Sequence, residues 1–376
     1  MHTVYVPADR YTTELTTDWG AQALAAIDEH ETIFRDLVGD DALVARVRTK
    51  LAAQPIEDVR IDFEDGYGNH SEEAEDSDAA RTAGQLAESV GTGTAPPFTG
   101  IRIKSLEAAT RARGVRTLAR FMSVLTHAGT ALTGFVVTLP KVTTVDQVAA
   151  MVYLCTRLER QFALDERALR FELQIETPQS IVGADGSALV ARMIHASDGR
   201  CTGLHFGTYD YTAYVGIAAG NQSLAHPAAD HAKLVMQAAA AGTGVRLSDG
   251  STNLLPIGDA TSVRTGWTTH LQLVRRGLER GLYQGWDLHP AQLPTRYAAT
   301  FGFYSEGFAA AAGRVRDHVE RHEGSVLDEP ATVRALADFL VRAVHCGAAT
   351  TDEIESATTQ SLPQLVALAR AGSVPR

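Results

Sequence analysis

Nine charged or ionisable side chains follow short apolar runs of the sequence, at points where a buried strand would end. They are Glu64 and Asp65 after IDF, Arg102 and Lys104 in IRIK, Lys141 in TLPK, Glu176 in LQIET, Asp210 in HFGTYD, Asp249 in RLSDG and His289 in WDLHP. Five of the nine are acidic. Carboxylates that converge on one pocket raise one another's pKa unless a cation lies among them. If these side chains meet in the folded chain, we expect a divalent metal ion to bind there.

Glu176 and Asp210 are the predicted metal ligands. Magnesium and manganese prefer oxygen ligands and usually take one or two protein carboxylates, which leaves positions for water and substrate oxygens. Each of the two residues ends an apolar run, and Pro178 suits the first turn of a helix that would follow Glu176. The alternatives are a glutamate that faces solvent and an aspartate that caps a helix.

The elements that must position these residues form a repeating pattern. Short apolar, β-branched or aromatic runs alternate with longer stretches of helical periodicity. We expect strands at 3–6, 58–64, 100–104, 134–140, 170–176, 203–206, 244–247 and 284–288. Eight βα units are the number in a (β/α)8 TIM barrel, in which the carboxyl ends of all strands open onto one face. That fold would bring the nine side chains together.

The main alternative architecture is an open, doubly wound sheet. Its GxGxxG fingerprint is expected after an early strand, and the sequence has none there. The stretch 11–57 contains two helical patterns, so the first crossover is enlarged. After residue 289 the pattern is wholly helical. We therefore predict a barrel catalytic domain over 1–308 and a C-terminal helical extension over 309–376.

Arg102 is predicted to contact the substrate through its positively charged guanidinium group. A guanidinium can grip a carboxylate with two hydrogen bonds or stabilise charge on an enolate oxygen, although an ion pair with Glu64 is an alternative. Ile101 and Ile103 alternate with Arg102 and Lys104, so the two cations share a face. Because two unpaired cations beneath a helix layer would be costly, we place both in the barrel interior near its mouth.

Composition excludes several other classes of protein. The 376 residues carry a formal net charge of -11 without a dense basic stripe, which argues against nucleic acid as a partner. No run of 18 apolar residues is present, which argues against a membrane partner. The three cysteines are widely spaced, which suits a reducing compartment, and we predict a cytoplasmic protein.

Six segments resemble motifs of a known enzyme family in their order and spacing. They are IDFEDGYG, IRIK, TLPKV, QIETPQS, LHFGTYDY and GWDLHPAQL, and together they cover about residues 60–292. They are similar to the HpcH/HpaI aldolase and citrate lyase family, especially its citrate lyase beta-subunit and malyl-CoA lyase branch. The resemblance implies a barrel of the phosphoenolpyruvate/pyruvate superfamily and a homo-oligomer.

The resemblance also implies a reaction. It implies a lyase or aldolase that cleaves or forms a carbon–carbon bond of a small 2-oxo or 2-hydroxy acid, or its thioester, through a metal-stabilised enolate. Mg2+ would be held at Glu176 and Asp210, and Arg102 would lie beside the reacting carbonyl, with Glu64 and Asp65 near the metal as further catalytic residues. The predicted substrate contacts are Lys104, Lys141, Gly207, Thr208, Asp249 and His289. Asp65, Asp249 and His289 are the candidates for the general base.

Two departures from the family pattern bear on the substrate. Lys104 stands where the branch commonly has asparagine, which adds a cation near the substrate. Trp286 and Asp287 stand where coenzyme A-dependent relatives often carry a lysine, so a coenzyme A thioester is uncertain, although Arg275, Arg276 and Arg280 could meet its phosphates. The alternative functions are a phosphoryl-transfer enzyme of the same superfamily and a non-catalytic barrel that binds a metabolite.

Overall fold

The computed structural model describes residues 2–320 and 329–370, and its centre is a sheet of eight parallel strands. The strands are β1 (His2–Pro7), β2 (Asp58–Asp62), β3 (Phe98–Arg102), β4 (Phe135–Leu139), β5 (Arg170–Ile175), β6 (Cys201–Phe206), β7 (Arg246–Ser248) and β8 (Gly285–Asp287). Their order is β7-β6-β5-β4-β3-β2-β1-β8. A parallel bridge between Ser248 and Gln284 joins the two ends of the sheet. The predicted (β/α)8 barrel is confirmed.

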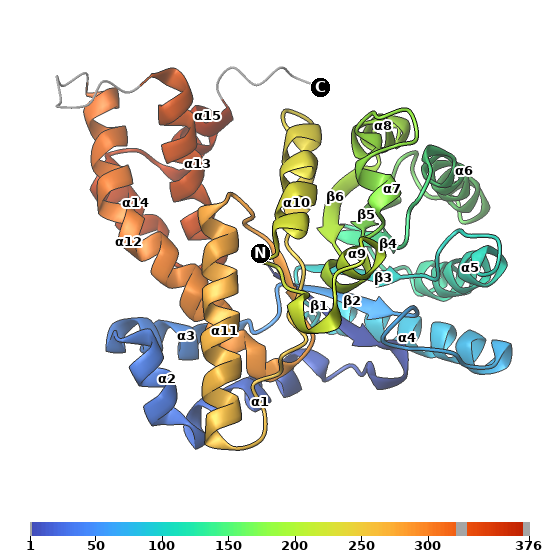
Figure 1. The fold of residues 1–376 in the computed structure, drawn as a ribbon, viewed down its shortest axis with the longest axis horizontal. Coiled ribbons are helices and arrows are strands. Elements are labelled where there is room, and N and C mark those ends of the chain that lie inside the picture. Colours follow the sequence, from blue (N-terminus) through green and yellow to red (C-terminus); the bar gives the residue numbers. More distant parts are fainter. Residues whose placement is uncertain (1, 321–328, 371–376) are drawn as a thin grey trace.

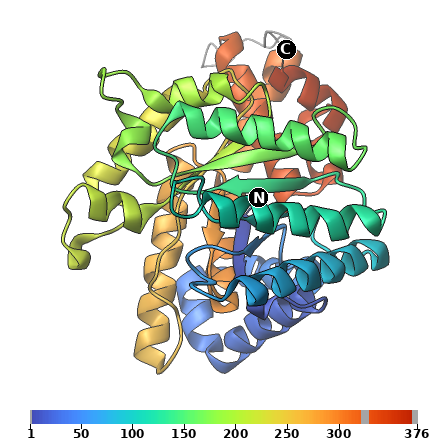
Figure 2. The ribbon, with the colours of Figure 1, turned by 90° about the vertical axis from the view of Figure 1, so that its right-hand side faces the viewer.

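Helices surround the strands (Figure 1). They are α1 (Leu15–Glu29), α2 (Glu31–Val38), α3 (Asp41–Ala53), α4 (Glu72–Thr92), α5 (Arg111–His127), α6 (Val145–Gln161), α7 (Pro178–Ile181), α8 (Leu189–Ala196), α9 (Thr208–Tyr214), α10 (Pro227–Ala240), α11 (Ala260–Glu279), α12 (Leu293–Val319), α13 (Pro330–Cys346), α14 (Thr351–Thr358) and α15 (Leu362–Arg370), with 3-10 turns η1 (Ala8–Arg10), η2 (Ala219–Asn221) and η3 (Pro290–Gln292). Figure 2 shows helices lying alongside the strands that precede them. The enlarged first crossover consists of α1, α2 and α3.

Helix α6 shows how the sequence specifies these elements. Thr144 and Gln147 form a capping box at its start, in which each side chain accepts a hydrogen bond from the other residue's backbone N–H. Val148, Met151 and Cys155 recur every three or four positions and are fully buried. The cap therefore fixes where the helix begins, and the apolar stripe fixes which side faces the sheet.

The C-terminal helices extend from the barrel as a lobe (Figure 1). Helix α12 packs on α3 and α11 as well as on α13 and α14, and it runs without a break through residue 308. The predicted division at 308 therefore falls inside one helix, and it stays a prediction. Across residues 2–320 and 329–370, every helix is either too short or too polar to cross a bilayer.

Paired charges fill the barrel interior. Arg60 of β2 donates hydrogen bonds to both carboxylate oxygens of Glu172 of β5, at 2.8 and 3.0 Å, and also pairs with Asp58. Glu172 lies 3.1 Å from His205 of β6, whose other ring nitrogen is 3.0 Å from the Tyr5 hydroxyl of β1. Side chains from four strands can meet in this way only inside the barrel. Burial opposes ionisation of Glu172, but Arg60 and His205 hold its pKa well below the usual range.

Candidate active site

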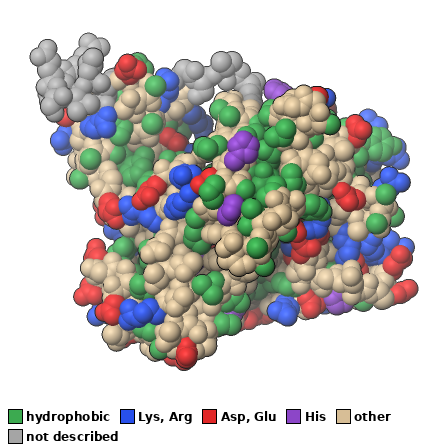
Figure 3. All heavy atoms as spheres, viewed as in Figure 1, with side chains coloured by type: hydrophobic (Ala, Val, Ile, Leu, Met, Phe, Trp, Pro, Cys, Tyr) green, Lys and Arg blue, Asp and Glu red, His purple; other side chains and the backbone are tan. Residues whose placement is uncertain are grey.

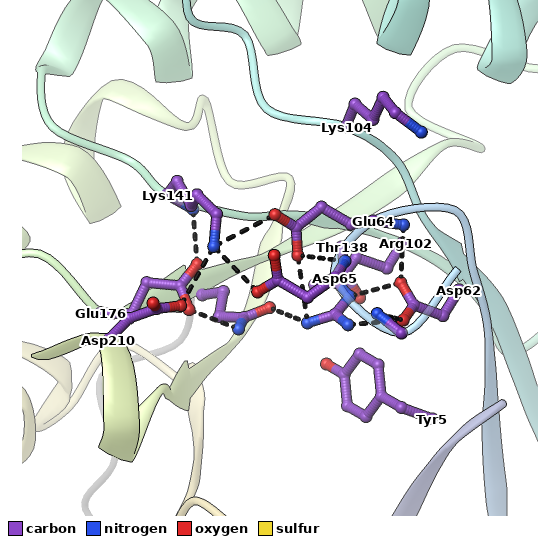
Figure 4. Close-up of polar contacts among 12 residues, drawn as sticks. Tyr5, Asp62, Glu64, Asp65, Arg102, Lys104, Thr138, Lys141, Glu176 and Asp210 are labelled. Carbon is purple, nitrogen blue, oxygen red and sulfur yellow. Dashed lines mark hydrogen bonds and ion pairs between the residues drawn. The ribbon is translucent and has the colours of Figure 1, made fainter. Parts of the chain in front are cut away.

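Arg102 forms the layer above this network, at the end of β3. Its Nε and Nη2 donate to the two carboxylate oxygens of Asp62 at 2.7 and 2.6 Å, so the guanidinium is held in a bidentate pair (Figure 4). The guanidinium carbon also lies 4.7 Å from the ring centroid of Tyr5. Burial disfavours the charge, but Asp62 and Glu64 raise the pKa of Arg102 well above its usual value. Arg102 is therefore a fixed cation inside the barrel, and it lies 3.5 Å from Glu64, the ion pair given above as the alternative.

Gln174 of β5 links Arg102 to Glu176. Its amide oxygen accepts from Arg102 Nη1 at 3.1 Å, and its amide nitrogen donates to Glu176 Oε2 at 2.6 Å. The other oxygen of Glu176 accepts the backbone N–H of Lys141 at 2.8 Å. Glu176 is 1% exposed, and burial, reinforced by the nearby carboxylates of Glu64 and Asp210, raises its pKa to about 8 despite the charge of Lys141. This carboxylate is thus oriented from two sides. The positive charge around it does not offset the effects of burial and of the nearby acids on its pKa.

Lys141 lies among the carboxylates at the mouth of the barrel. Its ammonium group is 3.1 Å from Glu64, 2.9 Å from Asp65 and 3.0 Å from Asp210 (Figure 4). Burial opposes its charge, but the surrounding acids, Glu176 and Glu64 first, raise the pKa of Lys141. Its backbone φ of 51° is in the left-handed region, which is uncommon for a residue other than glycine and directs its N–H towards Glu176. One residue therefore contacts four acids.

Gly207 allows Glu176 to occupy its position. A Cβ atom on Gly207 would lie 2.5 Å from Glu176 Oε2 and closer still to Glu176 Cβ. The next residue, Thr208, begins α9 and is 1% exposed, and its hydroxyl has no hydrogen-bond partner among the described residues. A buried hydroxyl without a partner costs free energy, so a ligand oxygen near Thr208 would relieve that cost.

The structure brings six of the nine predicted strand-end residues together and leaves three apart. Glu64, Asp65, Arg102, Lys141, Glu176 and Asp210 form one cluster. Lys104 is not in the interior near the mouth, because β3 ends at Arg102 and the Lys104 ammonium turns outward and donates to Glu75 of α4 at 2.8 Å. Figure 4 shows Lys104 apart from the cluster.

Asp249 and His289 have structural partners of their own. Asp249 follows β7 and is bound by Lys233 of α10 at 3.0 and 3.2 Å, so its carboxylate faces the helix layer. The ring of His289 accepts the N–H of Ala291 and caps η3, and burial lowers the pKa of His289. Neither residue contacts the cluster, so neither is placed as a general base.

The arginines considered for coenzyme A phosphates are already paired. Arg275 pairs with Glu306 and Glu279, and Arg276 and Arg280 pair with Asp230. All three lie at the end of α11, which leads into the start of β8. They are therefore at the opposite end of the barrel from the strand-end cluster.

The site also contains three residues that were not predicted from the sequence, namely Asp62, Gln174 and Tyr5. Asp62 lies within the apolar run, whereas the prediction considered only the two acids that follow the run. The signal was present, because Asp58, Arg60, Asp62 and Glu64 alternate with apolar residues and so share one face of the strand. Gln174 is uncharged and Tyr5 lies in the first strand, where no motif pointed to it.

The cluster fits a hard divalent cation in its chemistry. No three His, Cys, Asp or Glu side chains within residues 2–320 and 329–370 are arranged to enclose a metal by themselves. Magnesium needs only one or two protein carboxylates, and every acidic side chain of the cluster would offer it an oxygen ligand. Five carboxylates face two cations, the acids being Asp62, Glu64, Asp65, Glu176 and Asp210 and the cations Arg102 and Lys141. The excess of negative charge and the raised pKa of Glu176 favour a bound cation.

Solved structures with the same fold are found for two kinds of protein. CitE from Mycobacterium tuberculosis, solved in complex with magnesium, acetoacetate and coenzyme A, is similar with a TM-score of 0.53 and 18% identity, over 91% of this chain and 97% of that chain. Haloferax volcanii malate synthase, in its magnesium/glyoxylate complex, is similar with a TM-score of 0.51 and 14% identity, over 98% of this chain and 97% of that chain. At these identities the likeness bears on the fold alone, and the HpcH/HpaI assignment stays a prediction.

Sequence comparison places the chain in a family. No curated protein matches it. Residues 1–372, nearly the whole of the sequence, match the family described as "Domain of unknown function (DUF6986)", and the chain belongs to that family.

Proposed function

We propose that this chain is a Mg2+-dependent carbon–carbon lyase or aldolase that acts on a small 2-oxo or 2-hydroxy acid, or on its thioester. One observation carries the proposal. Glu176 and Asp210, which follow the neighbouring strands β5 and β6, contact the same residue, Lys141, above the buried guanidinium of Arg102. This cluster lies at the carboxyl ends of the strands, where the active sites of TIM barrels are found.

Glu176 and Asp210 would be the protein ligands of the ion. Magnesium is the first choice and manganese the alternative, because both take oxygen ligands. When bound, such an ion acts as a Lewis acid towards the oxygen atoms of the acid and stabilises the negative charge of the enolate. Glu176 already accepts one N–H on each oxygen, so its carboxylate does not need to be reorganised when a ligand arrives.

Arg102 and Thr208 would contact the substrate. Asp62 holds the guanidinium of Arg102 rigid, and a rigid cation in a buried site stabilises developing negative charge without reorganisation. We place the Thr208 hydroxyl as a donor to a substrate carboxylate oxygen, because it is buried and has no hydrogen-bond partner among the described residues. We place Lys141 as a further contact of the substrate carboxylate, because its side chain reaches the mouth.

Glu64 and Asp65 would move the proton. In cleavage, the hydroxyl proton leaves to a base, the carbon–carbon bond breaks, and its electron pair stays on the fragment that becomes the enolate. Partial burial raises the pKa of Asp65, but Lys141 outweighs it and lowers the pKa below the usual value, so Asp65 is ionised and can act as the base. Burial and the charge of Asp65 raise the pKa of Glu64, although the positive charges of Arg102 and Lys141 act to lower it. Neighbouring acids whose pKa values are pushed apart in this way suit an acid and a base.

The ligands of the structural neighbours support this choice of reaction at the level of fold analogy. One neighbour is described with magnesium, acetoacetate and coenzyme A, and the other with magnesium and glyoxylate. Both pairings join a divalent ion to a small oxo acid. Coenzyme A in one of them supports a thioester substrate, for which the arginines of α11 would not serve as the phosphate site.

The test is a thermal unfolding series with oxaloacetate, pyruvate and glyoxylate, each with and without Mg2+. We expect an acid to raise the Tm only when Mg2+ is present, and Glu176→Gln, which keeps the shape and removes the charge, to abolish the effect. Glu88→Gln, at an exposed position of α4, is the control and should behave as the unchanged protein.

Turnover is tested separately by following carbon–carbon cleavage of a panel of 2-hydroxy acids and their thioesters by NMR. Stabilisation by an acid without Mg2+, or an unaltered response in Glu176→Gln, would contradict the metal site. Mg2+-dependent binding with no cleavage of any panel member would favour a metabolite-binding barrel instead.

A further inference from the structure

A cavity of about 710 Å3 lies at the opposite end of the barrel from the candidate active site. Its wall includes Phe98 and Arg246, the first residues of β3 and β7, and Glu57, which precedes β2. Helices α12 and α13 close its other side through Tyr304 and Arg342. The cavity is therefore shared between the amino-terminal face of the barrel and the C-terminal helices.

Basic groups with free hydrogen-bond donors line this cavity. Arg246 is exposed, its guanidinium lies over the ring of Phe98 at 5.7 Å, and it has no carboxylate partner among the described residues. Arg342 lies over the ring of Tyr283 at 4.5 Å and pairs with Asp338 through Nε alone, so both of its Nη groups are available within the described part of the chain. His345 adds a third basic side chain.

The cavity contains little negative charge to offset these groups. Glu57 is the only carboxylate among the described residues of its wall, and Glu57 is already bound by Lys50 at 2.8 Å. The whole chain carries a formal net charge of -11, and acidic and basic side chains are interspersed on the face seen in Figure 3. A wall with free guanidinium groups and no free carboxylate therefore differs from the surface as a whole.

Cavity size alone does not produce this arrangement. A second cavity of about 620 Å3, between α1, the end of α3 and the residues before β3, has no charged side chain among its described lining residues. The larger cavity also offers apolar surface, from Val245, Leu247 and Tyr283, beside its cations. Its volume lies in the range of small-molecule sites, about 300–1,000 Å3.

We propose that this cavity binds a small organic anion, in which a phosphate or carboxylate group is attached to an apolar or aromatic body. Arg246 and Arg342 contact the anionic group, because planar guanidinium groups donate two parallel hydrogen bonds to such oxygens. The body packs against Val245, Leu247 and Tyr283. Because the wall comes from both the barrel and α13, the bound anion joins the two parts. This site is separate from the proposed reaction and does not depend on it.

The experiment measures binding by isothermal titration calorimetry with four probes. Adenosine monophosphate and benzoate each carry an anionic group on an aromatic body, whereas adenosine and inorganic phosphate supply only one of the two parts. We expect at least one complete probe to bind more tightly than either partial probe. Tighter binding of adenosine monophosphate would identify an organic phosphate, and tighter binding of benzoate an organic carboxylate.

Variants of the arginines locate the binding. Arg246→Ala and Arg342→Met should each weaken the complete probe at least about tenfold, since each removes charged hydrogen bonds to the anion. Arg246 is exposed, so its substitution leaves the fold intact, and Arg246→Lys should restore part of the affinity. Arg167→Ala removes an exposed arginine that pairs with Asp198 elsewhere and should change nothing. The proposal would be overturned if neither complete probe bound at millimolar concentration, or if Arg246→Ala and Arg342→Met both bound the probe as tightly as the unchanged protein.

Discussion

Gly207→Ala gives the sharpest test of how the candidate metal ligand is held. The backbone of Gly207 has φ of -96° and ψ of 94°, which alanine can adopt. The obstacle is space, because the new Cβ would lie 2.5 Å from Glu176 Oε2 and closer to Glu176 Cβ. Glu176 cannot simply retreat, since Gln174 and the backbone N–H of Lys141 hold its two oxygens. The substitution must therefore move the carboxylate or separate the ends of β5 and β6.

The size of the effect follows from the overlap. Ordinary contacts of a Cβ atom begin at about 3.4 Å, so an approach of 2.5 Å requires a shift of roughly 1 Å in a packed region. Overpacking of this kind costs about 1–3 kcal/mol. An unfolding entropy of about 2.1 cal/mol/K per residue over 376 residues gives about 0.8 kcal/mol/K, so the Tm should fall by roughly 1–4 °C.

The assay compares Gly207→Ala with Gly203→Ala, which lies within β6, the strand that ends just before Gly207. A Cβ on Gly203 would meet its nearest neighbour, Glu172 Cβ, at 3.6 Å, which is an ordinary contact. We expect Gly207→Ala alone to lose the rise in Tm that Mg2+ produces, because ligand binding stabilises a protein only while the folded site is intact. If both variants respond to Mg2+ equally, the close packing of Gly207 against Glu176 does not control the metal site, and the reasoning fails.

Three further perturbations probe the same cluster. Lys141→Met should tighten Mg2+ binding about tenfold by calorimetry, since the ammonium no longer competes with the ion for its carboxylate partners. Lys104→Met, which lies outside the cluster, is the control and should leave the affinity unchanged. Binding in Lys141→Met that is equal to or weaker than in the unchanged protein would count against competition. Mg2+ affinity should rise about tenfold for each pH unit up to about 8 and then level off, because the proton on Glu176 must leave before the carboxylate can bind the ion. An affinity that does not change between pH 6 and pH 8 would contradict the raised pKa of Glu176. Asp62→Asn should lower the free energy of unfolding by up to about 3–5 kcal/mol in urea titrations, because the buried Arg102 loses its bidentate partner and keeps only Glu64, at 3.5 Å. A loss below about 1 kcal/mol would mean that the bidentate pair does not control the stability of the barrel.

The barrel and its strand-end cluster could be predicted because both follow from local sequence. Runs such as FVVTL, which becomes β4, are apolar and β-branched, and polar residues mark where they stop. In a parallel barrel, the position of a residue along its strand determines which face of the fold it reaches. Glu64, Lys141, Glu176 and Asp210 could therefore be grouped without any knowledge of their contacts.

The same reasoning failed where a strand was shorter than its apolar run suggested. Alternation places side chains only while the strand lasts, and β3 ends at Arg102, so Lys104 turned outward to Glu75. Strand β7 lies at Arg246–Ser248, against the expected 244–247, so Asp249 does follow it directly, but Lys233 of α10 draws its carboxylate towards the helix layer. Strand length depends on pairing with neighbouring strands, which one run of sequence does not contain.

The buried charges below the mouth explain why the cluster is already ordered. Arg60 of β2 and Glu172 of β5 form a bidentate pair across the barrel interior, and the next layer contains a second bidentate pair, Arg102 and Asp62, on the neighbouring strands β3 and β2. Each pair resists displacement, since moving one member would leave a buried charge without its partner. Gln174 then passes this order to Glu176 through one hydrogen bond on each side of its amide. The orientation of the candidate metal ligand is therefore set from two sides, by Gln174 in the barrel interior and by the backbone N–H of Lys141 at the mouth. The contact with the interior ties Glu176 to a rigid strand, which positions a catalytic carboxylate more accurately than a loop alone.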